Sequence, residues 1–271
     1  MIRSVRRYAR IYGRLVAASV RSQWQYRASF ALYSASQLVA TLAEFGAIWA
    51  LFARFGSLPG WRLPEVAVLY GISNVAFALA EAGARGFDVF PGMVRTGDFD
   101  RLLLRPLPTA FQLAAHEVQI MRVGRLVQGS AILAWGCMGL GIEWDATRVS
   151  LVGLCVVGGA CIFAGLFVLQ ATLAFWTIES LEVVNIVTYG GNQMAQYPLT
   201  IYRPWFRLFF TVAVPLAAIN TVPMAALLSR PELSGLPAPL TWLAPCVGGP
   251  FLAACLLVWK LGERRYASTG S

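Results

Sequence analysis

The chain has 271 residues and a mass of 29.5 kDa, and 58% of its residues are hydrophobic while only 13% are charged. Soluble globular proteins carry about 25% charged residues. With a mean hydropathy of +0.62, these figures exclude a soluble enzyme, a disordered tail and a secreted disulfide scaffold, and they favour a protein with several membrane spans. The net charge of +9 is better explained by basic loops beside a lipid bilayer than by nucleic acid, and we expect no nucleic-acid partner.

Residues 1–27 are predicted to form an amphipathic helix that lies in the membrane interface. Arginines recur there at spacings of three, four and seven residues, and aromatic and aliphatic residues fall between them. Such a helix places its cations near anionic lipid headgroups. A solvated basic arm is the alternative. The arginines of the predicted interfacial helix are Arg3, Arg7, Arg10, Arg14 and Arg21.

Six apolar stretches predict an all-α integral membrane protein with six transmembrane helices, because a helix needs about 20 apolar residues to cross a bilayer. The third span is expected to continue a long helix that begins after Pro108, and the fifth is polar enough to need protein or a cavity beside it. Residues 197–228 contain four prolines, which break straight helices, and we expect short re-entrant helices there. The predicted spans are residues 30–53, 64–84, 123–142, 149–176, 181–196 and 240–259.

Polar residues inside these spans are candidates for a transport pathway or for an interface with another chain. Glu44 lies near the middle of the first span, and a charge at that depth costs several kcal/mol unless it faces protein or water. The alternative is a hydrogen-bonded Glu44 that only fixes helix packing. The candidate residues are Gln37, Thr41, Glu44, Asn74, Asn185, Asn192 and Gln193.

Charge asymmetry predicts the orientation. Of the 22 basic residues, 16 lie in residues 1–27, in residues 85–125 and after residue 259, and six lie in the other loops. Since cytoplasmic loops carry the excess of Lys and Arg, both termini are expected in the cytoplasm. We expect a multi-pass protein of a bacterial-type cytoplasmic (inner) membrane.

The chain shows no recognisable catalytic or cofactor motif. The five cysteines form no CxxC pair and lie in or beside apolar stretches, where Cys acts as a small hydrophobe. There is a single His, no zinc, hydrolase or dinucleotide signature, and no glycine loop that could hold nucleotide phosphates. We therefore expect no catalytic, metal or cofactor-binding residue, and any ATP used must bind to another chain.

Two stretches resemble one branch of the permease subunits of type-2 ABC transporters. Residues 97–108 read GDFDRLLLRPLP, which looks like the cytoplasmic segment after the second span, and residues 196–223 read QYPLTIYRPWFRLFFTVAVPLAAINTVP, which looks like the re-entrant segment. The order of parts agrees along essentially the whole chain. The resemblance implies a single permease domain over residues 1–271, and it identifies no substrate.

The resemblance also implies partners and a mechanism. Two permease chains, more often different than identical in this branch, would pair around a central pathway, and two ATPase subunits holding ATP and Mg would dock beneath them. Residues 1–27 would form a connecting helix, and residues 91–108 would form the coupling segment. The coupling residues would be Asp98, Phe99, Asp100, Arg101, Leu102, Leu103, Leu104 and Arg105.

The sequence predicts that the chain is the permease of an ATP-driven exporter. Export is preferred because this family mostly exports. Two alternatives are a membrane-embedded enzyme that acts on lipid or peptide, and a scaffold subunit that transports nothing. The enzyme reading has only Glu44 and Glu81 as acid–base candidates at membrane depth.

Overall fold

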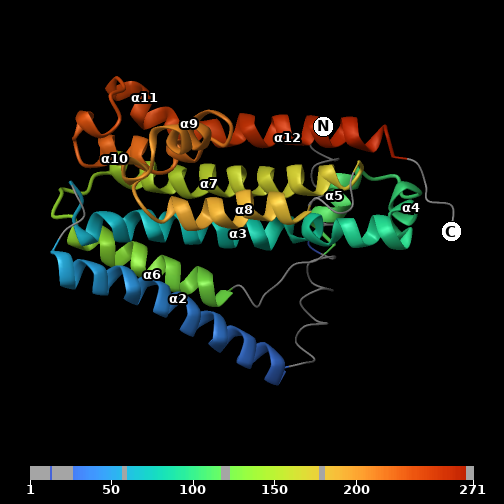
Figure 1. The fold of residues 1–271 in the computed structure, drawn as a ribbon, viewed down its shortest axis with the longest axis horizontal. Helices are drawn as coiled ribbons and strands as arrows, with labels where there is room; N and C mark the ends of the chain where they lie inside the picture. The colour runs from blue at the N-terminus through green and yellow to red at the C-terminus, as the bar shows by residue number, and fades with distance from the viewer. Residues whose placement is uncertain (1–12, 14–26, 57–59, 117–122, 177–180, 267–271) are drawn as a thin grey trace.

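The computed structural model describes residues 13, 27–56, 60–116, 123–176 and 181–266, and the long helices of these segments run alongside one another in a bundle (Figure 1). The predicted interfacial helix falls outside the described residues, apart from Gly13 and Arg27, and so do all five of its named arginines. In chain order the elements are α2 (Arg27–Phe55), α3 (Leu63–Thr96), α4 (Asp98–Leu103), α5 (Thr109–Ala114), α6 (Val123–Gly139), α7 (Ala146–Leu173), α8 (Leu181–Ala195), η2 (Leu199–Ile201), α9 (Pro204–Val212), η3 (Leu216–Ala218), α10 (Thr221–Leu227), η4 (Pro231–Leu233), α11 (Ala238–Leu243), η5 (Ala244–Val247) and α12 (Gly248–Glu263).

Helix α3 is the centre of the bundle. It packs against α6 on one side and α7 on the other, while α2 packs on α6 and α12 packs on α7. Helices α9, α10 and α11 gather at the end where α3 begins, and α4 lies at the opposite end (Figure 1). We call these the α10 end and the α4 end of the bundle.

Small residues set the distance between α3 and α6. A Cβ atom at Gly136 of α6 would come within 2.9 Å of the backbone nitrogen of Val68. Any larger residue at this position would push the two helices apart, which well-packed helices resist. The apolar residues around this contact, including Ile72 and Ile132, are buried.

Within the part of the chain that the structure describes, four helices are long and apolar enough to cross a membrane: residues 34–54, 63–96, 146–173 and 238–263. They coincide with the first, second, fourth and sixth predicted spans. Helices α6 and α8 have 17 and 15 residues, fewer than the roughly 20 that span a hydrocarbon core. A pair of helices bent by 80° over residues 204–227 would make a fifth candidate if counted as one broken span. The structure thus supports a multi-span α-helical protein with four or five apolar spans, and the count of six stays a prediction.

Two helices differ from the sequence-based expectation. Helix α3 has 34 residues and runs about 12 residues beyond the predicted end at Ala84. Arg85 and Asp88 of this extension pair with each other and with polar groups on α7 and α8, as described below, and Arg95 is exposed. The predicted long helix after Pro108 is interrupted, because α5 ends at Ala114 and α6 is a separate element.

Candidate functional site

The predicted coupling segment contains a short helix, as the sequence suggested. Helix α3 ends at Gly97, which has a φ of +75°, a left-handed conformation that glycine adopts without strain. This residue turns the chain directly into α4. The Thr96 hydroxyl donates to an Asp98 carboxylate oxygen at 2.7 Å, and Arg101 lies 3.5 Å from the same side chain. The latter pair is exposed, so it contributes little stability.

One face of α4 packs into the protein rather than outward. Phe99 is fully buried, and its ring meets those of Phe90 and Tyr266 at centroid distances of 4.9 Å and that of Phe175 at 5.8 Å. Leu102 is buried beside it. These two coupling candidates therefore anchor α4, and neither is accessible to a partner surface.

The other face of α4 and the residues after it are accessible. Leu104 is 85% exposed and Leu103 is 43% exposed, and Arg101 and Arg105 are also exposed. Asp100 is half-buried beside Tyr266; burial, with a smaller contribution from Asp100, raises the pKa of the Tyr266 hydroxyl. The accessible set is both apolar and basic.

A glutamine that sequence reasoning did not single out fixes the end of α4. The Nε2 atom of Gln112, on α5, donates to the carbonyl oxygens of Leu102 and Leu107 at 3.0 and 2.8 Å. Gln112 is buried, so these bonds are shielded from water. They hold the turn after α4 against α5. The only sequence signal is a polar residue within the apolar run TAFQLA.

A second group of polar residues joins α2, α3, α6 and α8 within the bundle, and we call it the polar cluster: Thr41, Glu44, Tyr70, Gln128 and Gln193. The hydroxyl of Tyr70 donates to the backbone carbonyl of Thr41 at 3.0 Å, and the Thr41 side chain bonds to Gln128. The amide of Gln193 donates to Glu44 at 3.4 Å. Three predicted residues, Thr41, Glu44 and Gln193, thus meet in one region.

The polar cluster has unused hydrogen-bonding capacity. The buried Oε2 atom of Glu44 and the buried Nε2 atom of Gln128 have no hydrogen-bond partner among the residues that the structure describes. Buried polar atoms normally find a partner. The sequence did not single out two of the five members, Tyr70 and Gln128, because their partners lie on another helix, α2.

The other predicted polar residues are placed separately. The backbone carbonyl of Gln37 accepts a hydrogen bond from the Thr41 hydroxyl at 2.6 Å. Asn74 is buried and donates to the carbonyl of Tyr70 at 3.0 Å, a bond within its own helix. Asn192 is buried with its Oδ1 atom unpaired within the described part of the chain. The side chain of Asn185 falls outside the described residues.

Glu44→Gln is predicted to leave folding unchanged within about 0.5 kcal/mol, because the amide keeps the bond to Gln193. Glu44→Leu is predicted to cost about 0.5–1.5 kcal/mol, because it removes the hydrogen bond that Glu44 accepts from the Gln193 amide. Thermal unfolding in detergent micelles measures both. A loss with glutamine as large as with leucine would show that the ionised carboxylate itself holds the helices.

Charged residues of the α3 extension form a network toward the α4 end. The guanidinium of Arg85 lies 2.5 Å from Asp88 and donates to the Tyr189 hydroxyl at 3.1 Å. Gln170 of α7 donates to Asp88 at 3.1 Å and accepts from Thr188 of α8 at 3.2 Å. These contacts let α3 stay helical through a charged stretch, since paired charges are far less costly to bury.

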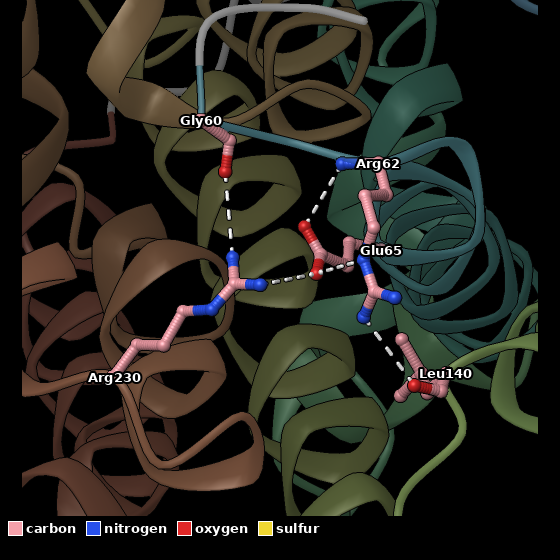
Figure 2. Close-up of polar contacts among 5 residues, drawn as sticks. All are labelled: Gly60, Arg62, Glu65, Leu140 and Arg230. Atoms are coloured by element: carbon pink, nitrogen blue, oxygen red, sulfur yellow. Dashed lines mark hydrogen bonds and ion pairs between the residues drawn. The ribbon is translucent and has the colours of Figure 1, made fainter.

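A third charged group lies at the α10 end and is shown in Figure 2. Glu65 is fully buried in the first turn of α3, and its Oε1 atom lies 3.0 Å from the Arg62 Nε atom and 3.2 Å from the Arg230 guanidinium. Arg62 also donates to the carbonyl of Leu140, and Arg230 donates to that of Gly60, both at 3.4 Å. We call these residues the Glu65 cluster. It ties the start of α3 to the end of α6 and to the chain that leaves α10.

Among the residues that the structure describes, no three His, Cys, Asp or Glu side chains gather as metal ligands would, and the five cysteines are free thiols.

The chain matches a known protein family over most of its length. Residues 38–270 match the family model of ABC-2 family transporter proteins. The matched residues include the coupling segment, the polar cluster and the Glu65 cluster. No curated protein and no solved structure matches the chain.

Proposed function

Because the chain belongs to the ABC-2 family of transporter proteins, we propose that it is the permease subunit of an ATP-driven exporter in a bacterial-type inner membrane. The match over residues 38–270 is the observation that carries this proposal. In the proposed orientation the α4 end faces the cytoplasm, as do both termini, and the α10 end faces outward. Basic residues are concentrated toward the cytoplasmic side in this arrangement.

Helix α4 is the proposed contact with the ATPase subunits. It lies at the tip of α3, whose 34 residues extend about 51 Å, well beyond a hydrocarbon core of about 30 Å. The buried Phe99 and Leu102 hold it rigidly to the bundle, and the exposed Leu103 and Leu104 face outward. In this proposal a groove on the ATPase receives the two exposed leucines, and ATP-driven closure pushes on α4.

A second permease chain is proposed to pack along α2. This helix carries large exposed apolar residues, with Leu32, Val39 and Trp49 all more than half exposed. The polar cluster lies where α2 meets α8, through the contact of Glu44 with Gln193. The pathway would then run between the two permeases and past the polar cluster, with ligands shifting the populations of inward-open and outward-open states.

Leu104→Asp is predicted to weaken ATPase docking by tenfold or more, because burying a leucine side chain contributes about 1.5–3 kcal/mol and a buried aspartate would oppose it. The tagged chain is purified from its native membranes, and the bound ATPase and the ATP hydrolysis of the complex are measured. Leu236→Asp is the matched control, since Leu236 is an exposed leucine at the α10 end.

The purified chain alone is expected to hydrolyse no ATP. Robust hydrolysis by the isolated chain, or equal docking by the Leu104→Asp variant and the wild type, would contradict the proposal. A complex that hydrolyses ATP but moves no native membrane component across reconstituted vesicles would instead favour a scaffold subunit.

A further inference from the structure

An apolar groove runs between α5 and α12 near the α4 end, and we call it the α5–α12 groove. Its volume is about 540 Å³, within the range of about 300–1,000 Å³ typical of ligand sites. Ala110, Ala114 and Phe111 of α5 line one wall, and Leu252, Leu256 and Lys260 of α12 line the other. Helices α3 and α7 form its floor.

The groove exists because small residues line the floor while a hydrogen bond fixes the walls. Gly83 and Ala84 of α3 and Ala164 of α7 have no side chain or a short one, so they leave space above the floor of the groove. The indole of Trp259 on α12 donates to the hydroxyl of Thr109 at the start of α5, at 3.1 Å and fully buried. This bond sets the distance between the two walls, so the groove is part of the packed structure.

The two ends of the groove differ in polarity. Leu252 and Ala164 belong to helices that are long and apolar enough to span a membrane. Two turns further along α12, the groove ends at Lys260 and Glu263, and Arg264 follows one turn after Lys260. Lys260 is the only lysine of the chain. The groove is therefore apolar at the end that contains Leu252 and Ala164. Its other end, which contains Lys260 and which we call the rim, carries charged residues.

We propose that the α5–α12 groove binds one phospholipid with an anionic headgroup, with an acyl chain along the groove and the phosphate at Lys260. An acyl chain matches the apolar walls, because apolar surface gains free energy when it is buried. A phosphate matches Lys260, which lines the groove with Glu263; Arg264, the C-cap residue one helical turn beyond Lys260, adds a second cation next to the groove. Leu257 and Leu261 on the same helix are exposed, so bilayer lipid has direct access.

Charge also argues against a second candidate occupant of the groove, the arginine-rich N-terminal segment of this chain. Residues 1–27 contain seven arginines, and the cationic rim would repel them. The same rim attracts anionic lipid, since each basic residue near an anionic membrane surface contributes about 1 kcal/mol. The proposal depends only on the chain being in a membrane, and it stands or falls independently of ATP-driven transport.

Photo-crosslinking in vesicles tests the proposal. Benzoylphenylalanine replaces Phe111 of α5 in the groove or, as a control, the exposed Leu261 of α12, which does not line the groove. The full-length chain is reconstituted in equal parts of phosphatidylcholine and phosphatidylglycerol. We expect phosphatidylglycerol adducts to predominate at position 111, and the two lipids to react in their bulk ratio at position 261. Lys260→Ala is expected to lower the preference at position 111 about fivefold, the effect of one basic residue, and Lys260→Arg is expected to retain it.

Each other result would overturn the proposal. Adducts to residues 1–26 or to another polypeptide would identify a protein occupant, and equal labelling by the two lipids would show bulk lipid only. Thermal unfolding of the same proteins guards against misfolded variants. Phosphatidylglycerol is expected to raise the unfolding midpoint of the wild type above its value in phosphatidylcholine. In the Lys260→Ala variant this difference between the two lipids is expected to be lost. A difference retained in that variant would also contradict the assignment.

Discussion

Phe99→Ala is expected to destabilise the α4 end of the bundle by about 3–5 kcal/mol, the usual cost of truncating a buried phenylalanine. The Phe99 ring is fully buried and packs edge-on against Phe90 and Tyr266. These geometries are the favoured ones for aromatic pairs. With the ring removed, α4 loses its main anchor, and ATP hydrolysis in the proposed complex should no longer be coupled to movement of the permease.

Limited proteolysis of the folded protein measures this effect locally. Cleavage after Arg101 by trypsin should become faster in the Phe99→Ala variant, because local opening exposes the backbone to the protease. Leu104→Ala is the control, since Leu104 is 85% exposed and surface truncations usually change stability by less than 0.5 kcal/mol. Equal cleavage rates in the two variants would mean that Phe99 does not anchor α4.

Arg230→Met is expected to cost about 3 kcal/mol in folding stability, because it leaves the buried Glu65 carboxylate with one cation fewer. The value is at the low end for a broken buried pair, since Arg62 still contacts Glu65 at 3.0 Å and Arg230 is itself partly exposed. The chain that leaves α10 should also separate from the start of α3. Thermal unfolding in micelles reports the first effect and proteolysis near residue 230 the second.

A double-mutant cycle separates charge from shape. Glu65→Gln removes the buried charge and keeps the side-chain volume, so the pair Glu65→Gln with Arg230→Met should be more stable than Arg230→Met alone. The interaction between contacting residues of this kind is usually 0.5–3 kcal/mol. Strict additivity of the two changes would show that the contact between Glu65 and Arg230 contributes nothing.

The long apolar helices could be predicted from the sequence because a bilayer span leaves a simple signal. Helix α2 begins three residues before the predicted start at Phe30, and α7 begins three residues before the predicted start at Val149. The length of α3 could not be predicted, because residues 85–96 look too charged for a continuous packed helix. Their charges are compensated by Gln170 on α7 and Tyr189 on α8, and only the folded chain brings these residues together.

The structure brings some of the predicted polar residues together, while their role in a pathway or interface stays a prediction. Spacing along one helix placed Gln37, Thr41 and Glu44 on a shared face, and the structure joins Thr41 and Glu44 to one polar cluster. The sequence could not say which face of α4 is buried, because Phe99 and Leu102 look as suitable for a partner's groove as for the chain's own core. The buried position of Glu65 could not be predicted either, since its second cation, Arg230, is 165 positions away along the chain.

The Gly136 contact has a mechanical consequence for α3. It fastens α6 to the first half of the helix, close to the Glu65 cluster, while α4 lies at the opposite tip. The other half of the helix is also held, by the contacts of Arg85 with Asp88 and Tyr189 and by the packing of Phe90 on Phe99. Because a rod of about 51 Å held near both ends cannot swing about one of them, a push on α4 would move α3 together with α6 and α7 as one rigid body.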